Sequence, residues 1–364
     1  MNNHYVVGLM SGTSMDGIDV SLVKTDGINL HRTGYQIHSN YEKKTNALLK
    51  NVVFDFAKNK RNKVLLSVLS ELITKDHFNA IKTIIQLSGI KPDLIGFHGQ
   101  TIFHNSSDNE SFQIGDGKLL ATLSKIKVVS NFRENDILHG GEGAPIAPIY
   151  HKLLIDNLKL ELPCCFLNIG GVSNLSYWDG KKLIGFDLGP GNGLMDIYCQ
   201  DILNIPYDKL GSIAAKGYPN LNIVNSFIQL PYFKKKYPKS LDRLEFINFV
   251  KELHLYDSHS SEVLATLLEL TVSSIVEGIR ILPFPPQKLV VMGGGQHNQH
   301  LFNRIKNSFS FKVSKADDIG ISADFIEAEL IAYLAARSIK NLPITFPSTT
   351  GVRVPCIGGQ VHLV

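Results

Sequence analysis

Short apolar runs that end in glycine turns recur along the chain and predict strands. Tyr5–Met10 and Ile18–Val23 flank such a turn, a pattern typical of a β-hairpin. Cys164–Ile169 and Leu175–Trp178 repeat this succession around Gly170-Gly171. The repetition indicates, weakly, that the chain consists of two similar halves.

Other apolar residues recur at helical spacing. This spacing predicts one or two helices within residues 45–87, an amphipathic helix over Ser261–Ile281 and a last helix over Ala323–Arg337. A further helix is expected over Pro145–Asn157. Short buried strands are expected at Asp93–Phe97, Lys127–Asn131, Lys182–Phe186 and Leu289–Met292. Strands and helices that alternate in this way predict an α/β protein.

Length and composition indicate a soluble globular protein with two domains. The chain has 364 residues, of which 44% are hydrophobic and 19% are charged, so intrinsic disorder is excluded. At about 100–200 residues per domain we expect two domains, residues 1–150 and 151–364. The chain contains no run of about 18 or more apolar residues, which a membrane span would require, and the N-terminus lacks a signal-peptide pattern. We therefore expect a cytoplasmic protein with no membrane partner.

Charge and cysteine content argue against further classes. Lys and Arg number 37 and Asp and Glu 33, and this net charge of +4 is too small to indicate nucleic-acid binding. The four cysteines include no CxxC pair, so neither a disulfide framework nor a zinc site is expected, and we predict buried reduced thiols. The basic stretch Tyr232–Ser240 is interpreted as a solvated loop.

Three glycine turns follow apolar strands, at Ser11–Ser14, Asn168–Gly171 and Gly293–Gly295. Glycine lets backbone N–H groups approach an anion without a clash at Cβ. The hydroxyl groups of the first turn, that of Ser11 included, would add donors for phosphate oxygens. Any one turn could be only a tight connection, but three of them at strand ends favour nucleotide binding.

The residues around these turns discriminate between nucleotide-binding folds. Gly12–Gly17 has the spacing of a P-loop, but Ile18-Asp19 stand where Lys-Ser/Thr is required, so a Walker A motif is excluded. No GxGxxG motif follows the first strand, which excludes a dinucleotide-binding fold there. A phosphate turn between two strands, present twice, favours the actin/hexokinase type of ATP-binding fold.

Acidic residues near the turns are candidates for chemistry. Asp16 and Asp19 could bind Mg²⁺ directly or through water, or could stabilise the turn itself. Asp187 follows the apolar run Leu183–Phe186 and precedes a glycine-rich turn, where α/β sheets place ligand chemistry. As an ionised carboxylate it could take a proton from water or a hydroxyl group, or it could cap the helix expected near Gly193.

Histidines and glutamates offer weaker signals. His98 and His104 are six residues apart, which matches no helical or hairpin zinc spacing, so we expect no metal site built from protein ligands. Glu142 and Glu327 could orient a sugar hydroxyl, although Glu327 could equally be an exposed helix residue.

A set of motifs, in order over residues 8 to about 335, resembles the anhydro-N-acetylmuramic acid kinase family. The motifs are Gly8–Asp19, Gly96–Thr101, Asn131–Arg133, His139–Pro145, Leu167–Asn174, Gly185–Asn192 and Gly293–Asn298. So many ordered matches are far more specific than one motif. The resemblance implies a two-lobed, actin/hexokinase-like α/β fold of duplicated ribonuclease H-like domains, with ATP in the interlobe cleft and Mg²⁺ carried by the nucleotide.

The resemblance also implies an activity and its residues. The family opens 1,6-anhydro-N-acetylmuramic acid from recycled peptidoglycan and phosphorylates O6, giving N-acetylmuramic acid 6-phosphate and ADP, often as a homodimer. By position, Asp187 would be the general base. ATP contacts would be Gly12, Thr13, Ser14, Met15, Asp16, Gly17, Ile18, Asp19, Gly170, Gly171, Gly293, Gly294 and Gly295, and sugar contacts His98, Arg133, Glu142 and Glu327. Leu188 and Glu142 depart from the family pattern, in which threonine and glutamine are frequent.

Other functions stay open from the residues alone. An ordinary sugar kinase would use Asp187 to deprotonate a substrate hydroxyl. A non-enzymatic switch of the actin type would bind ATP without a sugar. A basic surface built on Lys234–Lys236 for nucleic acid has little support from the net charge.

Overall fold

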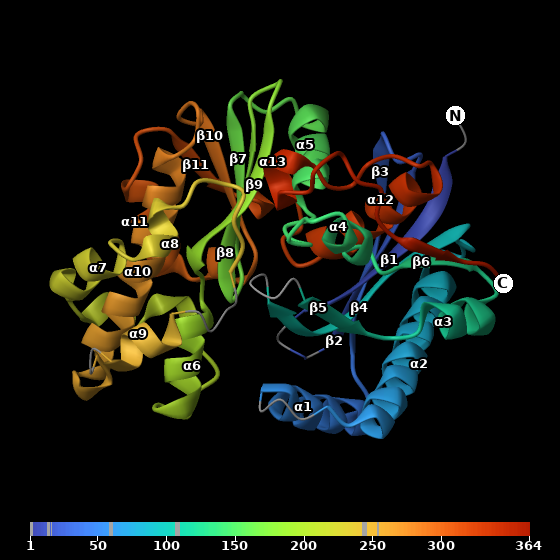
Figure 1. Ribbon diagram of the computed structural model, residues 1–364, viewed down its shortest axis with the longest axis horizontal. Coiled ribbons are helices and arrows are strands. Elements are labelled where there is room, and N and C mark those ends of the chain that lie inside the picture. Colours follow the sequence, from blue (N-terminus) through green and yellow to red (C-terminus); the bar gives the residue numbers. More distant parts are fainter. Residues whose placement is uncertain are drawn as a thin grey trace. The chain divides into compact units, whose positions relative to one another are not determined.

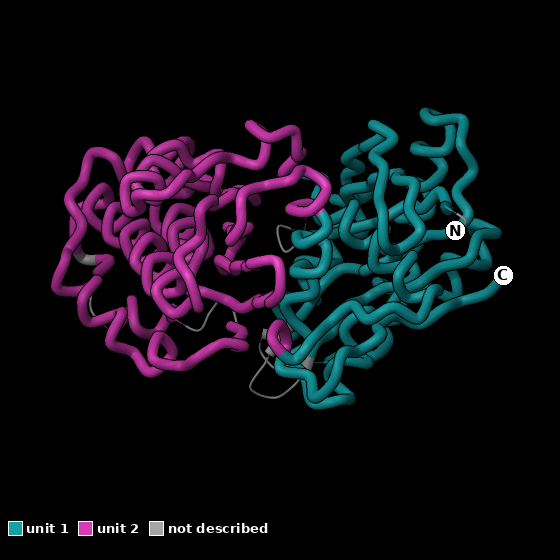
Figure 2. The backbone as a smooth tube through the Cα atoms, turned by 90° about the horizontal axis from the view of Figure 1, so that it is seen from above, with its two compact units in different colours: residues 1–153, 324–347, 351–364 teal, residues 154–323, 348–350 magenta. Residues whose placement is uncertain are grey.

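The computed structural model forms two compact units (Figure 2). It describes residues 3–12, 15, 17–57, 61–105, 110–241, 246–252 and 255–364. Unit 1 comprises residues 1–153, 324–347 and 351–364, and unit 2 comprises residues 154–323 and 348–350. The expected division into 1–150 and 151–364 differs from these units mainly because most of the C-terminal segment packs in unit 1.

Unit 1 is built on a seven-stranded mixed sheet. Its strands are β1 His4–Ser11, β2 Gly17–Thr25, β3 Leu30–Asn40, β4 Leu94–Asn105, β5 Glu110–Ile114, β6 Lys127–Ser130 and β12 Gln360–His362. They follow the order β12-β6-β4-β1-β2-β3, and β5 pairs with β4 (Figure 1). β1, β2 and β3 form an antiparallel meander, whereas β4 and β6 run parallel to β1.

Unit 2 repeats this arrangement with five strands. They are β7 Cys164–Ile169, β8 Val172–Trp178, β9 Leu183–Pro190, β10 Lys288–Met292 and β11 Lys312–Lys315, in the order β11-β10-β7-β8-β9. Here too the first three strands are antiparallel and the last two run parallel to the first. The order and sense equal those of β6-β4-β1-β2-β3, so the predicted duplication of a ribonuclease H-like fold is confirmed.

Helices of unit 1 cover both faces of its sheet. They include α1 Lys43–Ala57, α2 Lys63–Ser88, α3 Gly117–Ser124, α4 Glu134–Leu138, α5 Pro148–Asn157 and α12 Ile326–Ile339, and α5 continues into unit 2. Val7 and Leu9 of β1 share a core with Leu69 of α2. Because side chains alternate along a strand, Gly8 faces the opposite side, where α12 packs.

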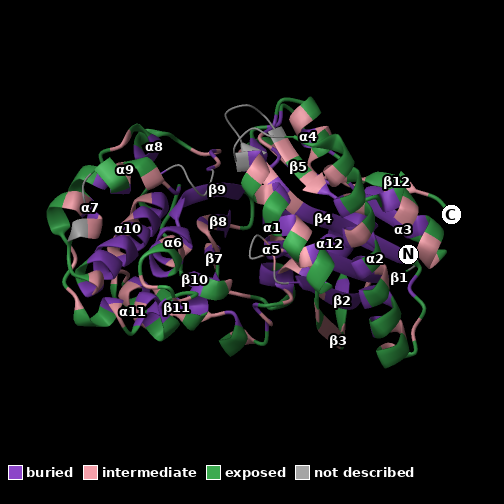
Figure 3. Cartoon of the chain, turned by 90° about the horizontal axis from the view of Figure 1, so that it is seen from below, coloured by how far each residue is buried: buried purple, intermediate pink, exposed green. Residues whose placement is uncertain are grey.

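Two glycines let α12 lie directly against this sheet. A Cβ atom added to Gly8 of β1 would stand 1.9 Å from the carbonyl oxygen of Ala328, and one on Gly96 of β4 would stand 2.5 Å from that of Ile331. The contact is therefore between main chains, with no room for a side chain at either strand position. α12 is buried along most of its length (Figure 3).

In unit 2 the long helix α10, Ser260–Arg280, packs on β9 and is mostly buried (Figure 3). The other helices are α6 Gly193–Asp201, α7 Leu221–Phe227, α8 Pro231–Lys234, α9 Ile247–Glu252, α11 Gln299–Asn307 and α13 Pro347–Thr350, the last shared with unit 1. Short 3₁₀ helices are η1 Lys209–Gly211, η2 Ala214–Lys216, η3 Leu255–Asp257, η4 Gly294–His297 and η5 Asp317–Ile319. All four cysteines are buried and free, as predicted.

The solvated loop predicted over residues 232–240 is wrong in part. Its first residues belong to α8, where Tyr232 and Phe233 are buried, and Lys239 is only 5% exposed. The aromatic rings belong to a cluster with Phe227 and Phe246, and this apolar packing outweighs the basic character of the stretch. Among the described residues, no helix combines the length and the apolar character needed to cross a membrane.

The close contact of α12 can be tested by Gly8→Ala. The added methyl group would meet a helix backbone that cannot move aside, so the free energy of unfolding should fall by about 3 kcal/mol. Urea denaturation followed by circular dichroism measures this change. Gly170→Ala is the control, because its added Cβ would meet nothing nearer than 3.7 Å, and it should cost less than about 0.5 kcal/mol. Equal stability of Gly8→Ala and the native chain would contradict the packing described.

Candidate active site

The first glycine turn, between β1 and β2, is held by side chains from outside the hairpin. The carbonyl oxygen of Gly12 accepts a hydrogen bond from Nε2 of the buried Gln100 on β4 at 3.0 Å. Oε1 of Gln100 in turn accepts one from the hydroxyl of Tyr41 at 3.1 Å. Nδ2 of Asn46 donates to the carbonyl oxygen of Met15 at 2.7 Å, and Met15 has a left-handed φ of 59°. These bonds fix Gly12 and Met15, two residues of the turn where a phosphate is expected.

Several residues predicted to contact ATP near this turn have roles in the packing of unit 1. Ser11 is buried, and its hydroxyl donates to Nε2 of His77 at 2.9 Å, so the expectation that it would donate to phosphate is wrong. The Ile18 side chain is packed in the core of unit 1. Gly17 is required for space, because a Cβ there would stand 2.5 Å from the carbonyl oxygen of Ser39. Three further predicted contacts of the turn lie outside the described residues: Thr13, Ser14 and Asp16.

The four predicted sugar residues all belong to unit 1, and Arg133 connects three of the segments that carry them. His98 lies on β4, Arg133 precedes α4, Glu142 follows α4, and Glu327 lies in the first turn of α12. Nε of Arg133 donates to Nε2 of His98 at 3.2 Å, and Nη1 donates to the carbonyl oxygen of Gly143 at 2.8 Å. The charge of Arg133 also acts on Glu327.

Burial decides the charge state of His98. Desolvation, assisted by the positive charge of Arg133, lowers the pKa of His98 to about 3. The ring is therefore neutral at physiological pH. Nδ1 donates to the carbonyl oxygen of Gly99 at 3.0 Å, which leaves Nε2 as the acceptor for Arg133. A neutral histidine thus orients the guanidinium group without repelling it.

The acidic residues of unit 1 have unequal environments. Burial raises the pKa of Glu327, the negative charge of Asp19 raises it further, and Arg133 opposes both effects. Asp19 on β2 is only partly buried and pairs with His38 on β3, with 2.7 Å between Oδ1 and Nδ1. A carboxyl group with a raised pKa suits proton exchange with a bound hydroxyl group.

Glu142 offers a direct sign of a ligand. Its Oε2 atom is buried and has no hydrogen-bond partner among the described residues. The loop that carries it is fixed, because the N–H of Gly143 donates to Oδ1 of the buried Asp136 at 2.8 Å. Buried carboxylate oxygens are rarely left unpaired, so a donor such as a sugar hydroxyl fits this position.

In unit 2 three glycine segments converge at the ends of β7, β9 and β10. The N–H of Asn192 donates to the carbonyl oxygen of Gly170 at 2.7 Å, and the N–H of Gly191 donates to that of Gly171 at 2.9 Å. A Cβ on Gly293, whose φ is 75°, would stand 2.3 Å from Oδ1 of Asn168. The structure thus brings the predicted turns of this unit together.

These glycines serve two different purposes. Gly293 and Gly295 are tightly packed, since a Cβ on Gly295 would stand 2.4 Å from the Ile169 side chain. Gly170 and Gly294 have open space beside them, with nothing nearer than 3.7 Å to an added Cβ. An anion can approach backbone N–H groups only where such space exists. Of the predicted contacts in unit 2, Gly294 fits phosphate best, because the N–H of Gly170 already donates to the carbonyl oxygen of Val172 at 3.1 Å.

Asp187 lies in the C-terminal half of β9 and is 7% exposed. Its Oδ2 atom accepts a hydrogen bond from the N–H of Leu241 at 2.8 Å. Its own N–H donates to the carbonyl oxygen of Lys239 at 2.9 Å, and its carbonyl oxygen accepts one from the hydroxyl of Tyr232 at 2.6 Å. The residue that precedes α6 as its N-cap is Asn192, so Asp187 does not cap that helix.

Leu188 has turned away from this carboxylate. Its side chain is buried against α10, where a Cβ on Gly278 would stand 2.1 Å from its Cδ2. The carboxylate of Asp187 contacts the N–H of Leu241 instead, so the two side chains have different surroundings. The departure from the threonine frequent in the family therefore concerns packing in unit 2.

The sequence model for "Anhydro-N-acetylmuramic acid kinase" matches residues 4–363 of this chain. A protein of that name from Rhodopseudomonas palustris is 38% identical over 361 residues, which cover 97% of each chain. One from Nitrobacter winogradskyi is 37% identical over 366 residues, which cover 98% of each chain. This chain belongs to the anhydro-N-acetylmuramic acid kinase family. The predicted family, and with it the prediction of a kinase, is confirmed.

Two solved structures show a more distant likeness to this family member. Component A of (R)-2-hydroxyglutaryl-CoA dehydratase from Acidaminococcus fermentans has a TM-score of 0.45 and 11% identity, covering 92% of this chain and 99% of that chain. A ROK family glucokinase from Streptomyces griseus has a TM-score of 0.38 and 10% identity, covering 90% of this chain and 97% of that chain. The fold assignment rests instead on the strand order of each unit.

Residues that hold the candidate site escaped the sequence reasoning. Gln100 had a usable signal, because it lies in the motif Gly96–Thr101 together with His98. Lys239 and Tyr232 had no such signal, since their stretch has the composition of a surface loop.

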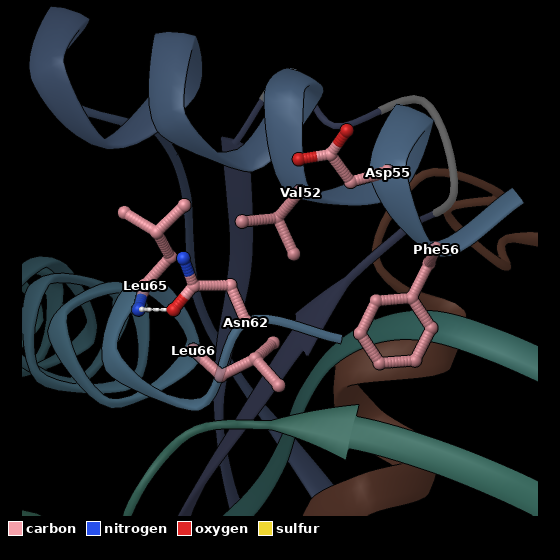
Figure 4. Close-up of a pocket in the computed structure, with 6 residues that line it drawn as sticks. All are labelled: Val52, Asp55, Phe56, Asn62, Leu65 and Leu66. Atoms are coloured by element: carbon pink, nitrogen blue, oxygen red, sulfur yellow. Dashed lines mark hydrogen bonds between the residues drawn. The ribbon is translucent and has the colours of Figure 1, made fainter. Parts of the chain in front are cut away.

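The pocket in Figure 4 lies at the junction of α1 and α2 and contains no candidate residue. It is lined by Val52, Asp55, Phe56, Asn62, Leu65 and Leu66.

Three buried histidines of this family member predict acid-sensitive stability. Burial lowers the pKa of His77 to about 4 and those of His98 and His151 to about 3, with Arg133 assisting at His98. The unfolded chain, with histidine pKa values of about 6.5, takes up protons first. The free energy of unfolding should therefore fall as pH decreases from about 6.5 to 4, by up to about 1.4 kcal/mol per pH unit for each histidine.

Urea denaturation at pH 7, 6 and 5 measures this dependence. His77→Asn should reduce the slope of the free energy of unfolding against pH by the contribution of one histidine, because asparagine does not titrate. His31→Asn, a change of an exposed histidine, is the matched control and should leave the slope as it is. An unchanged slope in His77→Asn would contradict the burial of a neutral ring.

Proposed function

We propose that this chain is an ATP-dependent kinase that opens 1,6-anhydro-N-acetylmuramic acid with water and phosphorylates O6, giving N-acetylmuramic acid 6-phosphate and ADP during peptidoglycan recycling. Family membership over nearly the whole chain supports this substrate. The observation that carries the proposal is Asp187, a buried carboxylate fixed by its side chain and by both main-chain groups. Such a fixed carboxylate suits a general base.

The sugar is proposed to contact the polar cluster of unit 1. Glu142, with its unpaired buried oxygen, would accept a hydrogen bond from a sugar hydroxyl. Arg133, oriented by neutral His98, suits the carboxylate that this substrate carries. Glu327, whose pKa is raised by burial, would exchange a proton with a second hydroxyl. These four residues thus provide acceptors and a cation of the kinds that an acidic amino sugar requires.

ATP is proposed to contact the glycine turns. Gly294 has open space beside its backbone, and Gly12 of the first turn is held in place by Gln100. ATP supplies the phosphoryl group, and the Mg²⁺ that accompanies it neutralises phosphate charge. Asp19 is the described carboxylate next to this turn, and contact with the Mg²⁺ hydration shell would compete with its pairing to His38. The homodimer implied by the resemblance is part of the same proposal.

Asp187 is proposed to act on water. An aspartate is ionised at neutral pH and takes one proton from the water whose oxygen bonds to C1 of the sugar. The C1–O6 bond breaks, and its electron pair stays on O6. O6 bonds to the γ-phosphorus as the bond to the bridging oxygen of ADP breaks. The proton held by Asp187 then passes to solvent, which returns the base to its ionised form.

Asp187→Asn tests the base. The amide cannot accept the proton, so kcat should fall by at least about a hundredfold. ATP affinity should change little because the variant keeps size and shape. Coupled ADP release gives kcat, and isothermal titration with ATP gives affinity. Asp179→Asn, which alters a turn-forming aspartate of the same unit, should retain activity. Near-native turnover by Asp187→Asn would refute the assignment.

Isotope labelling separates hydrolytic opening from simple phosphorylation. In ¹⁸O-labelled water, mass spectrometry of the sugar phosphate should find the label at C1 and none in the phosphoryl group. Label in inorganic phosphate instead would mean that the chain hydrolyses ATP. Glucose and N-acetylmuramic acid serve as comparison substrates, and faster phosphorylation of either would favour an ordinary sugar kinase.

A further inference from the structure

A buried lysine lies beside the proposed base in unit 2. Nζ of Lys239 donates to the carbonyl oxygen of Tyr232 at 3.2 Å and lies 4.4 Å from the centroid of its ring. The same atom lies 5.9 Å from the ring centroid of Phe186, the residue before Asp187. A buried ammonium group is costly unless an opposite charge accompanies it, so the identity of that charge matters.

The contacts that place Lys239 also place Asp187. The N–H of Asp187 donates to the carbonyl oxygen of Lys239, and the N–H of Leu241 donates to its carboxylate. Tyr232, which holds the ammonium group, donates its hydroxyl to the carbonyl oxygen of Asp187. The two charged residues are thus fixed to one another by the segment Tyr232–Leu241, which we call the clamp segment.

Burial and two charged residues of the described part of the chain act on this lysine. Burial lowers the pKa of Lys239 to about 8, the positive charge of Lys235 lowers it further, and Asp187 opposes the decrease. Tyr237 stacks on Phe186 with 5.4 Å between ring centroids, and Nζ of Lys182 lies 5.4 Å from the Tyr237 centroid. Among the residues that the structure describes, Asp187 is therefore the anion that offsets the buried charge.

We propose that Lys239 is a positioning residue for Asp187. The ammonium group of Lys239 favours the ionised carboxylate of Asp187 and so keeps the base active as the pH falls. The inference rests on the role proposed above for Asp187. Attraction between two charges is mutual, so the carboxylate that stabilises the ammonium group is stabilised by it. Loss of the positive charge would let Asp187 take up a proton at higher pH, where it can no longer act as a base.

Lys239→Met tests the charge in turnover. A nearby opposite charge shifts the pKa of an aspartate by about one unit or more, so the acid limb of kcat/KM against pH should move upward by about one unit. Activity would fall about tenfold on that limb and little on the plateau. Lys239→Arg should restore the native limb. Lys236→Met, a change of an exposed lysine in the clamp segment, is the matched control and should leave the limb in place. An equal loss at every pH would overturn the proposal and leave only a packing role.

A second measurement leaves Lys239 unchanged. With ¹³Cε-labelled lysine, the Lys239 resonance, assigned by its absence from Lys239→Arg, should titrate near pH 8 in the native chain. In Asp187→Asn it should titrate at lower pH, because the attraction is lost. Identical titration in both proteins would overturn the inference. This readout needs no turnover, so it stands apart from the substrate, whereas near-native activity of Asp187→Asn would overturn the proposed function.

Discussion

The main-chain contact between α12 and the sheet of unit 1 is the constraint on which the polar cluster of that unit depends. Gly8 and Gly96 let the helix lie at backbone distance, and a side chain at either position would displace it. Glu327 stands in the first turn of this helix, within the electrostatic reach of Asp19 and Arg133. A helix more than 300 residues from β1 in sequence thus supplies a candidate sugar contact. The two glycines, which have no side chain, determine the position of that helix.

An ion pair with a buried carboxylate also fixes the position of this helix. Glu329 is buried and accepts hydrogen bonds from Nε of Arg32 at 2.8 Å, from Nε2 of Gln36 at 3.1 Å and from the hydroxyl of Tyr150 at 2.5 Å. A buried carboxylate with this many donors is well satisfied, whereas loss of one partner would leave an uncompensated charge. The glycines set the distance of α12 from the sheet, and Glu329 opposes sliding or rotation. The orientation of Glu327 follows from both.

Local pattern predicted those elements whose formation is local. The hairpins β1–β2 and β7–β8 follow from apolar runs around a turn, and α10 follows from its helical spacing. β3, which the pattern did not predict, is polar along most of its length, because one side of it is solvated and its position is set by pairing with β2. The membership of α12 in unit 1 depends on glycines far away in sequence, and no local signal contains that information.

In the candidate site, too, some residues were predictable from local motifs and others depend on tertiary packing. Asp187 and the glycine turns were predictable because motifs carry them, whereas the bond of Arg133 to neutral His98 depends on packing that joins β4 to the segment before α4. Lys239 shows the limit most clearly. Its stretch has the charge of a surface loop, yet the rings of Tyr232 and Phe233 are buried, and Lys239 is buried beside them.

Burial disfavours the charged forms of His98, Glu327 and Lys239. Two of these residues lie near an opposite charge, which is Arg133 for Glu327 and Asp187 for Lys239. In each unit a cation therefore lies near a carboxyl group: Arg133 opposes the rise in the pKa of Glu327, and Lys239 and Asp187 each stabilise the charged form of the other.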